Sequence, residues 1–308
     1  MNLFDVVMPY VLAGISVGGQ YALIAIGYTM VYGILRLINF AHGDVFMVAG
    51  LLMVYVAASL PLFAAIPIVI LLTMLLTFFI ERAAYKPLRQ APRMSVMISA
   101  IGVSYLLQNM ALYVTGGLNK NYTVIPWISD SITVLGATTK RVTVITPFLV
   151  IAIVFCLVFL IQRTKVGIAM RAVAKDFETS QLMGIKIDSV ISSTFAVGSF
   201  LAVIGSILYF SNYPGVIPTS GGMLGLKAFI AAVFGGIGSI PGAVLGGILI
   251  GTCESLIKGL DTILGQAGLI KTPMELATFS DAFTFVLLII ILVFKPTGLF
   301  GEKATDKV

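Results

Sequence analysis

Hydrophobic residues occur along this chain in long runs that are separated by short polar segments. A helix needs about 20 mainly apolar residues to cross the hydrocarbon core of a membrane, and several runs approach that length. The pattern predicts an all-α polytopic membrane protein with 8–9 transmembrane helices, folded as a single transmembrane domain over residues 1–308. The nine runs cover residues 9–33, 45–60, 62–80, 95–114, 143–161, 190–210, 224–237, 243–257 and 279–294.

The composition supports the membrane assignment. Of 308 residues, 59% are hydrophobic and 10% are charged, and the mean hydropathy is +1.07. A soluble domain carries about 25% charged residues, so a single aqueous core could not hide this much apolar surface. The N-terminus, MNLFDVVMPYVL, lacks the basic region and cleavage site of a secretory signal, so we expect the first run to stay as a transmembrane helix.

The basic residues predict the orientation of the chain. They gather in three regions that fall on the same side of the predicted spans, and the positive-inside rule makes that side cytoplasmic. An odd number of spans then places the N-terminus in the periplasm and the C-terminus in the cytoplasm. The dispersal of the net charge of +6 among short loops argues against a nucleic-acid partner. The basic residues of these three regions are Arg82, Lys86, Arg89, Arg93, Arg163, Lys165, Arg171, Lys175, Lys186, Lys295, Lys303 and Lys307.

The longest loop on the opposite side covers residues 115–142 and holds the only tryptophan, Trp127. Trp127 could anchor the loop at the membrane interface, as tryptophan commonly does. Alternatively, the loop could form a docking surface for an external partner.

Two hydrophobic stretches are interrupted in ways that a simple span is not. Such paired interruptions are typical of transporters built from repeats, because unwound backbone at membrane depth must line a cavity or be buried in protein. We therefore expect both segments to line or gate a translocation path, and we treat an internal repeat as a hypothesis. The sequence leaves open whether residues 34–44 are re-entrant. The candidate path residues are Asn39, His42, Asp44, Gly235, Gly236, Gly238, Pro241 and Gly242.

The ionisable residues within the apolar runs are few. His42 could serve a proton relay, although a structural pair is favoured, in which Asp44 caps the following helix. Glu254 lies in an apolar run, and Lys258 follows at helical spacing and could pair with it. Cys156 and Cys253 have no partners at ligand spacing. We expect no catalytic or metal site.

Glycines recur at close-packing spacing, as in Gly14 with Gly18, Gly242 with Gly246, and Gly247 with Gly251. This spacing lets helices approach backbone to backbone. Packing within one subunit is favoured over a dimer interface.

The polar segment 163–188 predicts an ordered loop on the cytoplasmic side. Its apolar residues, Ile168, Ala172, Phe177, Leu182 and Met183, indicate short amphipathic helices, and Gly184 is a candidate C-cap. The loop could meet a soluble partner or lie on the membrane surface. The chain has no Walker A motif, so any ATP hydrolysis must occur on another chain. We predict no enzyme activity and no cofactor here.

Three segments resemble the permease subunits of branched-chain amino acid ABC importers, and most closely the first of the two homologous permeases of the high-affinity leucine, isoleucine and valine system. They are LINFAHGDVFMVAG, VGIAMRAVAKDFETSQLMGI and AAVFGGIGSIPGAVLGG. The resemblance implies a complex in the bacterial inner membrane with a second permease, two cytoplasmic ATPases that bind ATP and Mg, and a periplasmic substrate-binding protein. Related permeases carry other amino acids, amides and urea.

The resemblance also implies roles for individual residues. The loop 163–188, here called the coupling loop, would contact a groove in an ATPase. The NFAHGD and GGIGSIPG segments would shape the translocation path during alternating access. The alternatives are an ion- or proton-coupled secondary amino acid transporter, which would depend on His42, Asp44 or Glu254, and a passive channel. The residues implied for ATPase coupling are Gly167, Arg171, Ala172, Glu178 and Gly184.

Overall fold

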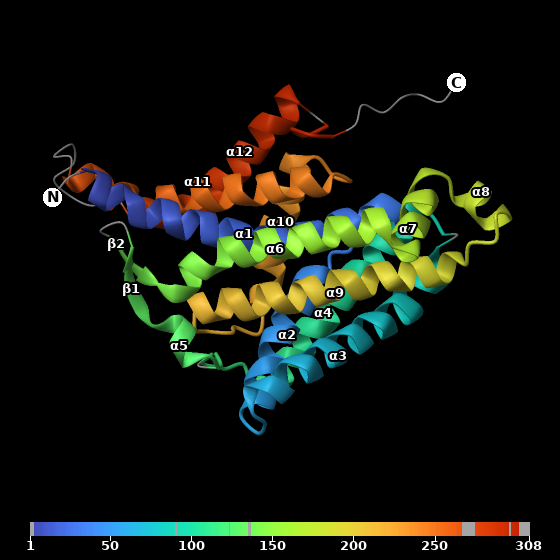
Figure 1. Cartoon of the computed structure of the whole chain (residues 1–308), viewed down its shortest axis with the longest axis horizontal. Coiled ribbons are helices and arrows are strands. Elements are labelled where there is room, and N and C mark those ends of the chain that lie inside the picture. The colour runs from blue at the N-terminus through green and yellow to red at the C-terminus, as the bar shows by residue number, and fades with distance from the viewer. Residues whose placement is uncertain are drawn as a thin grey trace.

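Long helices that run roughly parallel to one another make up most of the computed structural model (Figure 1), which describes residues 3–89, 91–122, 124–134, 137–266, 275–295 and 297–301. Each of the nine predicted apolar runs coincides with one helix, so the prediction of an all-α polytopic protein is confirmed. These helices are α1 (Leu3–Leu35), α2 (His42–Ala57), α3 (Leu62–Ile80), α4 (Arg93–Thr115), α6 (Arg141–Arg163), α9 (Ile187–Asn212), α10 (Ser220–Gly235), α11 (Ile240–Gln266) and α12 (Ser280–Phe294).

Two of the nine apolar helices are not part of a segment long enough to cross a membrane. Seven spans are long and apolar enough, one of them formed by α12 together with the preceding residues Leu276–Phe279, whereas α2 and α10 have 16 residues each. At 1.5 Å per residue each extends about 24 Å, against a hydrocarbon core of about 30 Å. Both helices therefore need neighbours at the depth where they begin.

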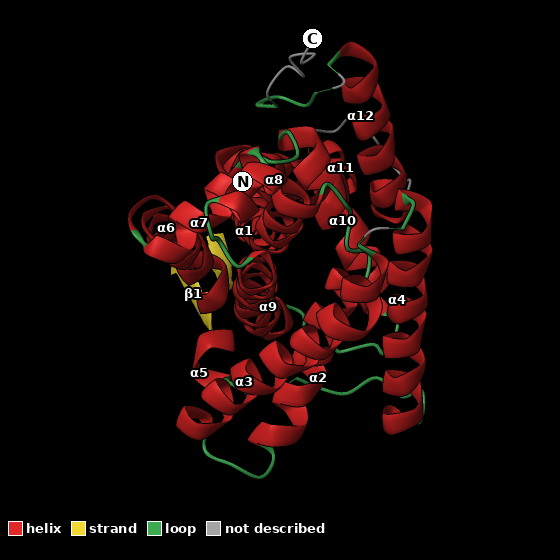
Figure 2. Cartoon of the chain, turned by 90° about the vertical axis from the view of Figure 1, so that its right-hand side faces the viewer, coloured by secondary structure: helices red, strands yellow, loops and turns green. Residues whose placement is uncertain are grey.

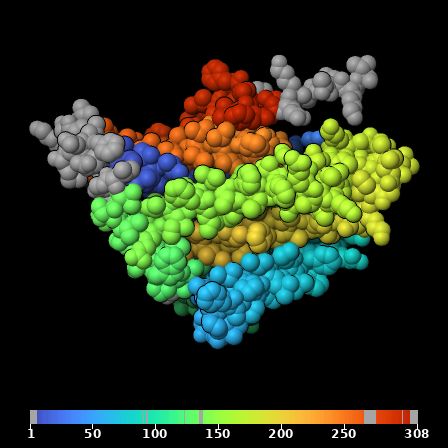
Figure 3. Space-filling view, viewed as in Figure 1, coloured from blue at the N-terminus to red at the C-terminus, as the bar shows by residue number. Residues whose placement is uncertain are grey.

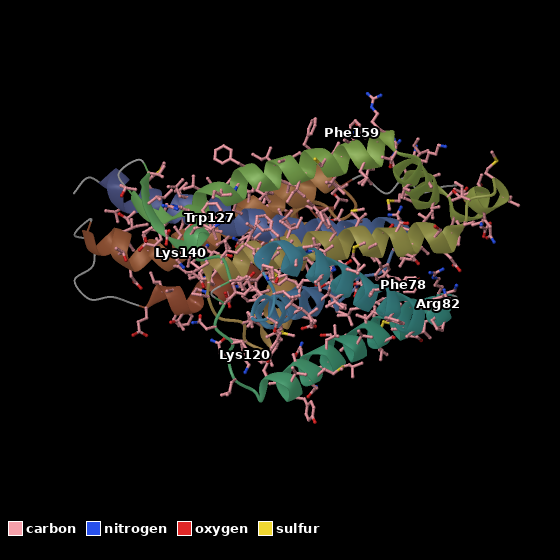
Figure 4. The ribbon with its side chains drawn as sticks, turned by 60° about the horizontal axis from the view of Figure 1, so that its bottom comes forward. Phe78, Arg82, Lys120, Trp127, Lys140 and Phe159 are labelled. Carbon is pink, nitrogen blue, oxygen red and sulfur yellow. The ribbon has the colours of Figure 1, made fainter. Side chains whose placement is uncertain are left out.

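The smaller elements lie at the two ends of the molecule. One end, here called the basic end, carries the π-helical turn η1 (Glu81–Tyr85), η2 (Lys86–Leu88), α7 (Lys165–Lys175) and α8 (Phe177–Leu182). The other, the hairpin end, carries α5 (Pro126–Ser129) and the antiparallel strands β1 (Ser131–Val134) and β2 (Ala137–Lys140), paired from Ser131 opposite Lys140. Figure 4 shows Arg82 at one end and Lys120, Trp127 and Lys140 at the other. The turn η3 (Leu276–Phe279) precedes α12.

The helices differ sharply in burial. In Figure 2, α1 and α9 lie in the middle of the molecule, with α6 at one edge and α4 and α12 at the opposite edge. Their most apolar windows are 72% and 61% buried in α1 and α9, but 22%, 17% and 11% buried in α4, α6 and α12. Figure 3 shows α6 lying across one face between α11 and α9. The exposed apolar helices can face lipid or a neighbouring subunit.

Glycines bring α1 and α11 into backbone contact. A Cβ added to Gly14 would lie 2.6 Å from the Cα of Thr252, and one added to Gly18 would lie 2.6 Å from the Cα of Ile248. Gly247 and Gly251 of α11 meet the backbone of α1 in return. The glycine spacing thus serves packing within one subunit, as the sequence favoured.

This contact predicts an unusual response to a mild substitution. In a helix interior, Gly→Ala stabilises by about 0.5–1 kcal/mol through backbone entropy, yet Gly18→Ala should destabilise the protein by about 1–3 kcal/mol because its methyl overlaps the α11 backbone. Gly102→Ala is the matched control, because an added Cβ there has nothing within 4 Å. Thermal unfolding in detergent, followed by size-exclusion chromatography, measures both variants. Equal melting temperatures for the two would contradict the packing assignment.

Candidate functional site

The first turns of α2 and α10 meet near the middle of the bundle. After α1, residues 36–41 form a non-helical segment, and α2 then runs toward the hairpin end, where the chain turns into α3. After α9, residues 213–219 form a second non-helical segment, and α10 then runs toward the basic end. The two short helices therefore begin at a common point and run in opposite directions; we call this point the half-helix junction (Gly43, Asp44, Gly221 and Gly225).

Small residues make the half-helix junction possible. A Cβ on Gly43 would lie 2.5 Å from the Cα of Gly225, and a Cβ on Gly221 would lie 2.5 Å from Oδ1 of Asp44. Helix N-termini carry partial positive charge and unpaired N–H groups. The junction thus brings two electropositive helix ends to one carboxylate.

Asp44 is fully buried at this junction. Its carboxylate accepts hydrogen bonds from Ser104 Oγ at 2.5 Å and Gln108 Nε2 at 3.0 Å. Among the described residues no cation pairs with it. Because Ser104 and Gln108 are only partly buried, the hydrogen-bonded group extends from the buried carboxylate to the surface of α4.

The prediction that Asp44 caps the following helix is wrong. Ala41 is the N-cap residue of α2, and no side chain caps it. Asp44 lies in the first helical turn instead, where its charge favours the helix dipole while its oxygens bond to α4.

His42 fills a notch between two glycines. A Cβ on Gly27 would lie 2.7 Å from Cε1 of the imidazole, and one on Gly198 would lie 3.5 Å from it. The ring also meets the edge of Tyr28, with centroids 5.2 Å apart. Its Nε2 atom is buried and has no hydrogen-bond partner in the described part of the chain, so the geometry supports packing rather than proton transfer.

Asn39 fixes the non-helical segment before α2. Its side-chain Oδ1 accepts hydrogen bonds from the backbone N–H of Ala41 at 3.1 Å and from Tyr85 Oη at 2.5 Å. Asn39 is 2% exposed. Its side chain therefore provides an acceptor that the interrupted helix cannot provide.

Aromatic side chains close the space between the half-helix junction and the basic end. Tyr28 and Phe40 each lie 6.1 Å from Phe229, measured between ring centroids. Tyr28 and Phe229 also line a cavity of about 10 Å³, roughly the space of one water. This cavity is too small to hold an amino acid.

The glycine-rich segment 235–242 lies elsewhere. Gly236 and Gly238 adopt positive φ values of 105° and 100° in the turn that ends α10. Pro241 is in the first turn of α11, and Gly242 packs on the backbone of Gly235. This turn is at the opposite end of α10 from Asp44, so the structure does not bring the two predicted interruptions together.

Sequence reasoning missed the true counterpart of the first interruption. That counterpart is the segment 213–219 with Gly221 and Gly225, and the run predicted to begin at residue 224 left it out. Pro214 and Pro218 were its signal, because proline rarely continues a helix. Ser104 and Gln108 were also missed, although each is a polar residue within the predicted run 95–114.

The loop at the basic end forms two short helices, as predicted. The buried face of α7 consists of Gly167, Met170 and Val173. Of the apolar residues that indicated amphipathic helices, Ile168 is 52% exposed and Ala172 is only half-buried. Arg171 is exposed.

The C-terminal end of α8 matches the prediction for Gly184. Gly184 has φ +82°, its N–H bonds to the Gln181 carbonyl, and the Ile185 N–H bonds to the Ser180 carbonyl. These bonds form a Schellman motif. Glu178 is exposed on α8, and just beyond it Leu182 and Met183 are 87% and 79% exposed. An exposed apolar pair beside charged side chains suits contact with a protein.

A second buried polar group joins α10, α11 and α12. The predicted pairing of Glu254 with Lys258 is confirmed at 2.6 Å, and Glu254 also binds Lys227 at 2.8 Å and Tyr21 Oη at 2.9 Å. Lys227 pairs in addition with Asp281 at 2.6 Å. Two cations face two carboxylates, so this charge cluster is neutral overall.

The hairpin end packs on the end of α9. Lys140 Nζ donates to the Asn212 carbonyl at 2.5 Å, and Ser129 Oγ donates to the Ser211 carbonyl at 3.2 Å. Tyr122 is buried, which raises the pKa of its hydroxyl. Trp127 is 55% exposed, which fits either an interfacial anchor or a docking surface.

Comparison with known proteins gives a consistent result. The family described as "Branched-chain amino acid transport system / permease component" matches residues 10–292. BraD of Pseudomonas aeruginosa, a high-affinity branched-chain amino acid transport system permease protein, is 39% identical over 96% of each chain. LivH of Escherichia coli, which has the same description, is 35% identical over 96% of each chain. The ribose import permease protein RbsC of Haemophilus influenzae is 26% identical over 78% of this chain and 74% of its own.

The charge cluster predicts a compensation experiment. Glu254→Gln removes one of the two carboxylates that pair with buried Lys227 and leaves Asp281 as the only carboxylate of the cluster. The variant should therefore lose about 3–5 kcal/mol of stability. Adding Lys227→Met should restore much of the loss, because Lys258 and Asp281 are 44% and 37% exposed and can be hydrated. Thermal unfolding in detergent compares the single and double variants. A double variant less stable than Glu254→Gln alone would contradict the assignment.

Proposed function

Because the chain belongs to the family of branched-chain amino acid transport system permease components, we propose that it is the transmembrane permease of an ATP-driven importer that moves leucine, isoleucine and valine across the bacterial inner membrane. The observation that carries the proposal is a match to such permeases over nearly the whole chain. The chain is a transport subunit, and ATP and Mg bind to partner subunits.

The orientation follows from charge. The basic end is cytoplasmic under the positive-inside rule, so the hairpin end faces the periplasm, with the N-terminus on that side and the C-terminus in the cytoplasm. The partners are a second, homologous permease, two cytoplasmic ATPases and a periplasmic substrate-binding protein. The hairpin end around Trp127, exposed and ordered by contacts with α9, is the surface on which the binding protein docks.

The half-helix junction is the place on the translocation path where polar groups contact the substrate, and we call it the polar station. The substrate is a zwitterion with an apolar side chain. The Asp44 carboxylate attracts the ammonium group, and the N-termini of α2 and α10 favour the carboxylate group. Gln108 and Ser104 carry this polarity from Asp44 to the subunit surface, where substrate passes between the two permeases. The aromatic cluster of Tyr28, Phe40 and Phe229 closes the cytoplasmic side of the path.

The other candidate residues shape this path without touching the substrate. Asn39 and His42 position the start of α2. The turn from Gly235 to Gly242, with Gly236, Gly238 and Pro241, connects the cytoplasmic end of α10 to α11. Its glycine geometry sets how α10 moves relative to α11.

The α7–α8 loop couples the permease to ATP hydrolysis. Arg171, Glu178 and the exposed pair Leu182 and Met183 enter a groove on an ATPase. Gly167 seats α7 on the end of α6, and Ala172 is half-buried on the same helix. Closure of the two ATPases on ATP draws the loops of both permeases together, and hydrolysis releases them. Rigid-body motion of the helices then alternates access to the path.

The function is tested with the reconstituted complex. Leucine uptake into proteoliposomes should require ATP, the ATPases and the binding protein, and vanadate should stop it. Uptake by the chain alone under an ion gradient would support the secondary transporter instead, and non-accumulating flux would support a channel.

The coupling loop is tested in the same system with Gly184→Val. The substitution strains a residue at φ +82°, so leucine transport should fall about tenfold or more while ATP hydrolysis continues. Gly265→Val is the control, because Gly265 is also open to space but has an ordinary φ. Full transport by Gly184→Val would overturn the loop assignment.

The polar station is tested with Gln108→Ala. Loss of the amide should raise the apparent KM for leucine about 10- to 100-fold, which corresponds to the roughly 1.5–3 kcal/mol of one hydrogen bond to a charged group, with ATPase activity retained. Asn109→Ala is the matched control, because among the described residues the Asn109 amide bonds only to the Tyr105 carbonyl of its own helix. Equal leucine kinetics in both variants would exclude Gln108 from the path.

A further inference from the structure

The π-helical turn η1 extends α3 at the basic end and contacts two distant parts of the chain. Turns of this kind are rare and occur frequently at functional sites. η1 begins at Glu81 and ends at Tyr85, and both of these side chains are buried. One faces the start of α9, and the other faces the segment that leads into α2.

On the α9 side, charged groups tie η1 and η2 to the first turns of α9. Lys86 pairs with Asp188 at 2.5 Å, and Arg89 bridges Asp188 and Glu81. Ser192 Oγ donates to Glu81 at 3.0 Å. Asp188 and Ser192 follow the α8 helix after only the segment 183–186, so any displacement of the coupling loop reaches them first.

These contacts differ in strength. The pair of Lys86 with Asp188 is largely exposed, and such pairs contribute little. Glu81 is 1% exposed, and leaving a buried carboxylate unpaired is costly. Glu81 therefore keeps Arg89 and Ser192 together, and η1 moves with the start of α9.

On the α2 side, Tyr85 reaches Asn39 in the non-helical segment that leads into α2. Its hydroxyl donates to Asn39 Oδ1 at 2.5 Å, and the same oxygen accepts from Ala41 N–H at 3.1 Å. Ala41 is the N-cap of α2. Arg36, at the start of this segment, adopts φ 53°, a left-handed conformation that costs energy in a residue with a side chain. The segment is therefore held in shape by outside contacts, and the hydrogen bond from Tyr85 is one of them.

We infer that Tyr85 and Asn39 are positioning residues that carry the movement of the α7–α8 loop to the N-terminus of α2, through Asp188, Arg89 and Glu81. The inference rests on the proposed function, because it takes the loop to be driven by ATPases. It adds a route by which the nucleotide state of the ATPases reaches Asp44 in the first turn of α2. A displaced Ala41 changes the register of α2 against α10 at Gly43 and Gly221.

The first experiment measures leucine transported per ATP hydrolysed by the reconstituted complex. Tyr85→Phe removes only the hydroxyl, and the ratio should fall about fivefold to tenfold, the worth of one buried hydrogen bond between two conformations, with ATPase activity unchanged. Tyr122→Phe is the control, because it removes an equally buried hydroxyl that has no hydrogen-bond partner among the residues the structure describes. If Tyr85→Phe behaves like Tyr122→Phe, the inference is overturned.

A double-mutant cycle tests the route itself. Asp188→Asn weakens both ion pairs at the other end of the connection. If both residues act in one connection, the combined variant should lose no more coupling than the worse single variant. Additive losses would mean that Tyr85 and Asp188 act independently and would overturn the proposed route.

A cargo-independent readout separates this inference from the proposed function. A cysteine at Gly222, an exposed residue beside Gln108, is introduced after Cys156 and Cys253 are replaced by serine. Its labelling by a maleimide should change with ATP and vanadate in the parent complex, and the change should disappear with Tyr85→Phe. No nucleotide effect in the parent, or the same effect in both, would overturn the inference. Absence of leucine uptake by the parent would instead overturn the proposed cargo.

Discussion

The requirement to pair every backbone polar group within the bilayer governs this fold. A continuous helix meets the requirement by itself, but the segments 36–41 and 213–219 do not, and both enter the bundle. Each is supported by a partner. Asn39 supplies a side-chain acceptor to Ala41, and Val216 exchanges two backbone hydrogen bonds with Lys120, at 3.1 and 2.9 Å. Both interruptions also bury part of their length, Asn39 and Ala41 in the first and Val216 and Pro218 in the second.

Two kinds of contact divide the work of holding the helices together. Glycines set distances where helices must approach closely, as between α1 and α11 and between α2 and α10. Charges set connections where an element must stay attached, as Lys227 and Glu254 do for α10, α11 and α12. Glycine contacts limit only how closely two helices approach, whereas an ion pair keeps two particular side chains together. The half-helix junction belongs to the first kind, and the buried charge cluster belongs to the second.

The sequence predicts the helices much better than it predicts the site. Hydropathy identifies all nine apolar helices, because burial in lipid depends on local composition. The spacing of residues along the chain also predicts the pairing of Lys258 with Glu254 and the cap at Gly184, since each involves residues within about one helical turn. The contact of Gly43 with Gly221 is different, because it joins residues far apart in the chain and leaves no local pattern. In a hydropathy pattern a half-helix looks the same as a short span, so the pattern does not show in which direction the half-helix runs or at what depth it begins. Asp44 was expected to bond within its own helix, but α4 offered donors that no local rule includes.

The end of α10 is completed by residues from near the C-terminus. The carbonyls of Phe234 and Gly235 accept hydrogen bonds from Leu299 and Phe300, both at 2.9 Å. Gly298 fits against the backbone of Val233 and Gly236, where a Cβ would overlap. During synthesis these carbonyls lack the donors of Leu299 and Phe300 until those two residues have left the ribosome. The last turn of α10 can therefore be completed only after α11 and α12 have been synthesised, although α10 precedes both of them in the chain.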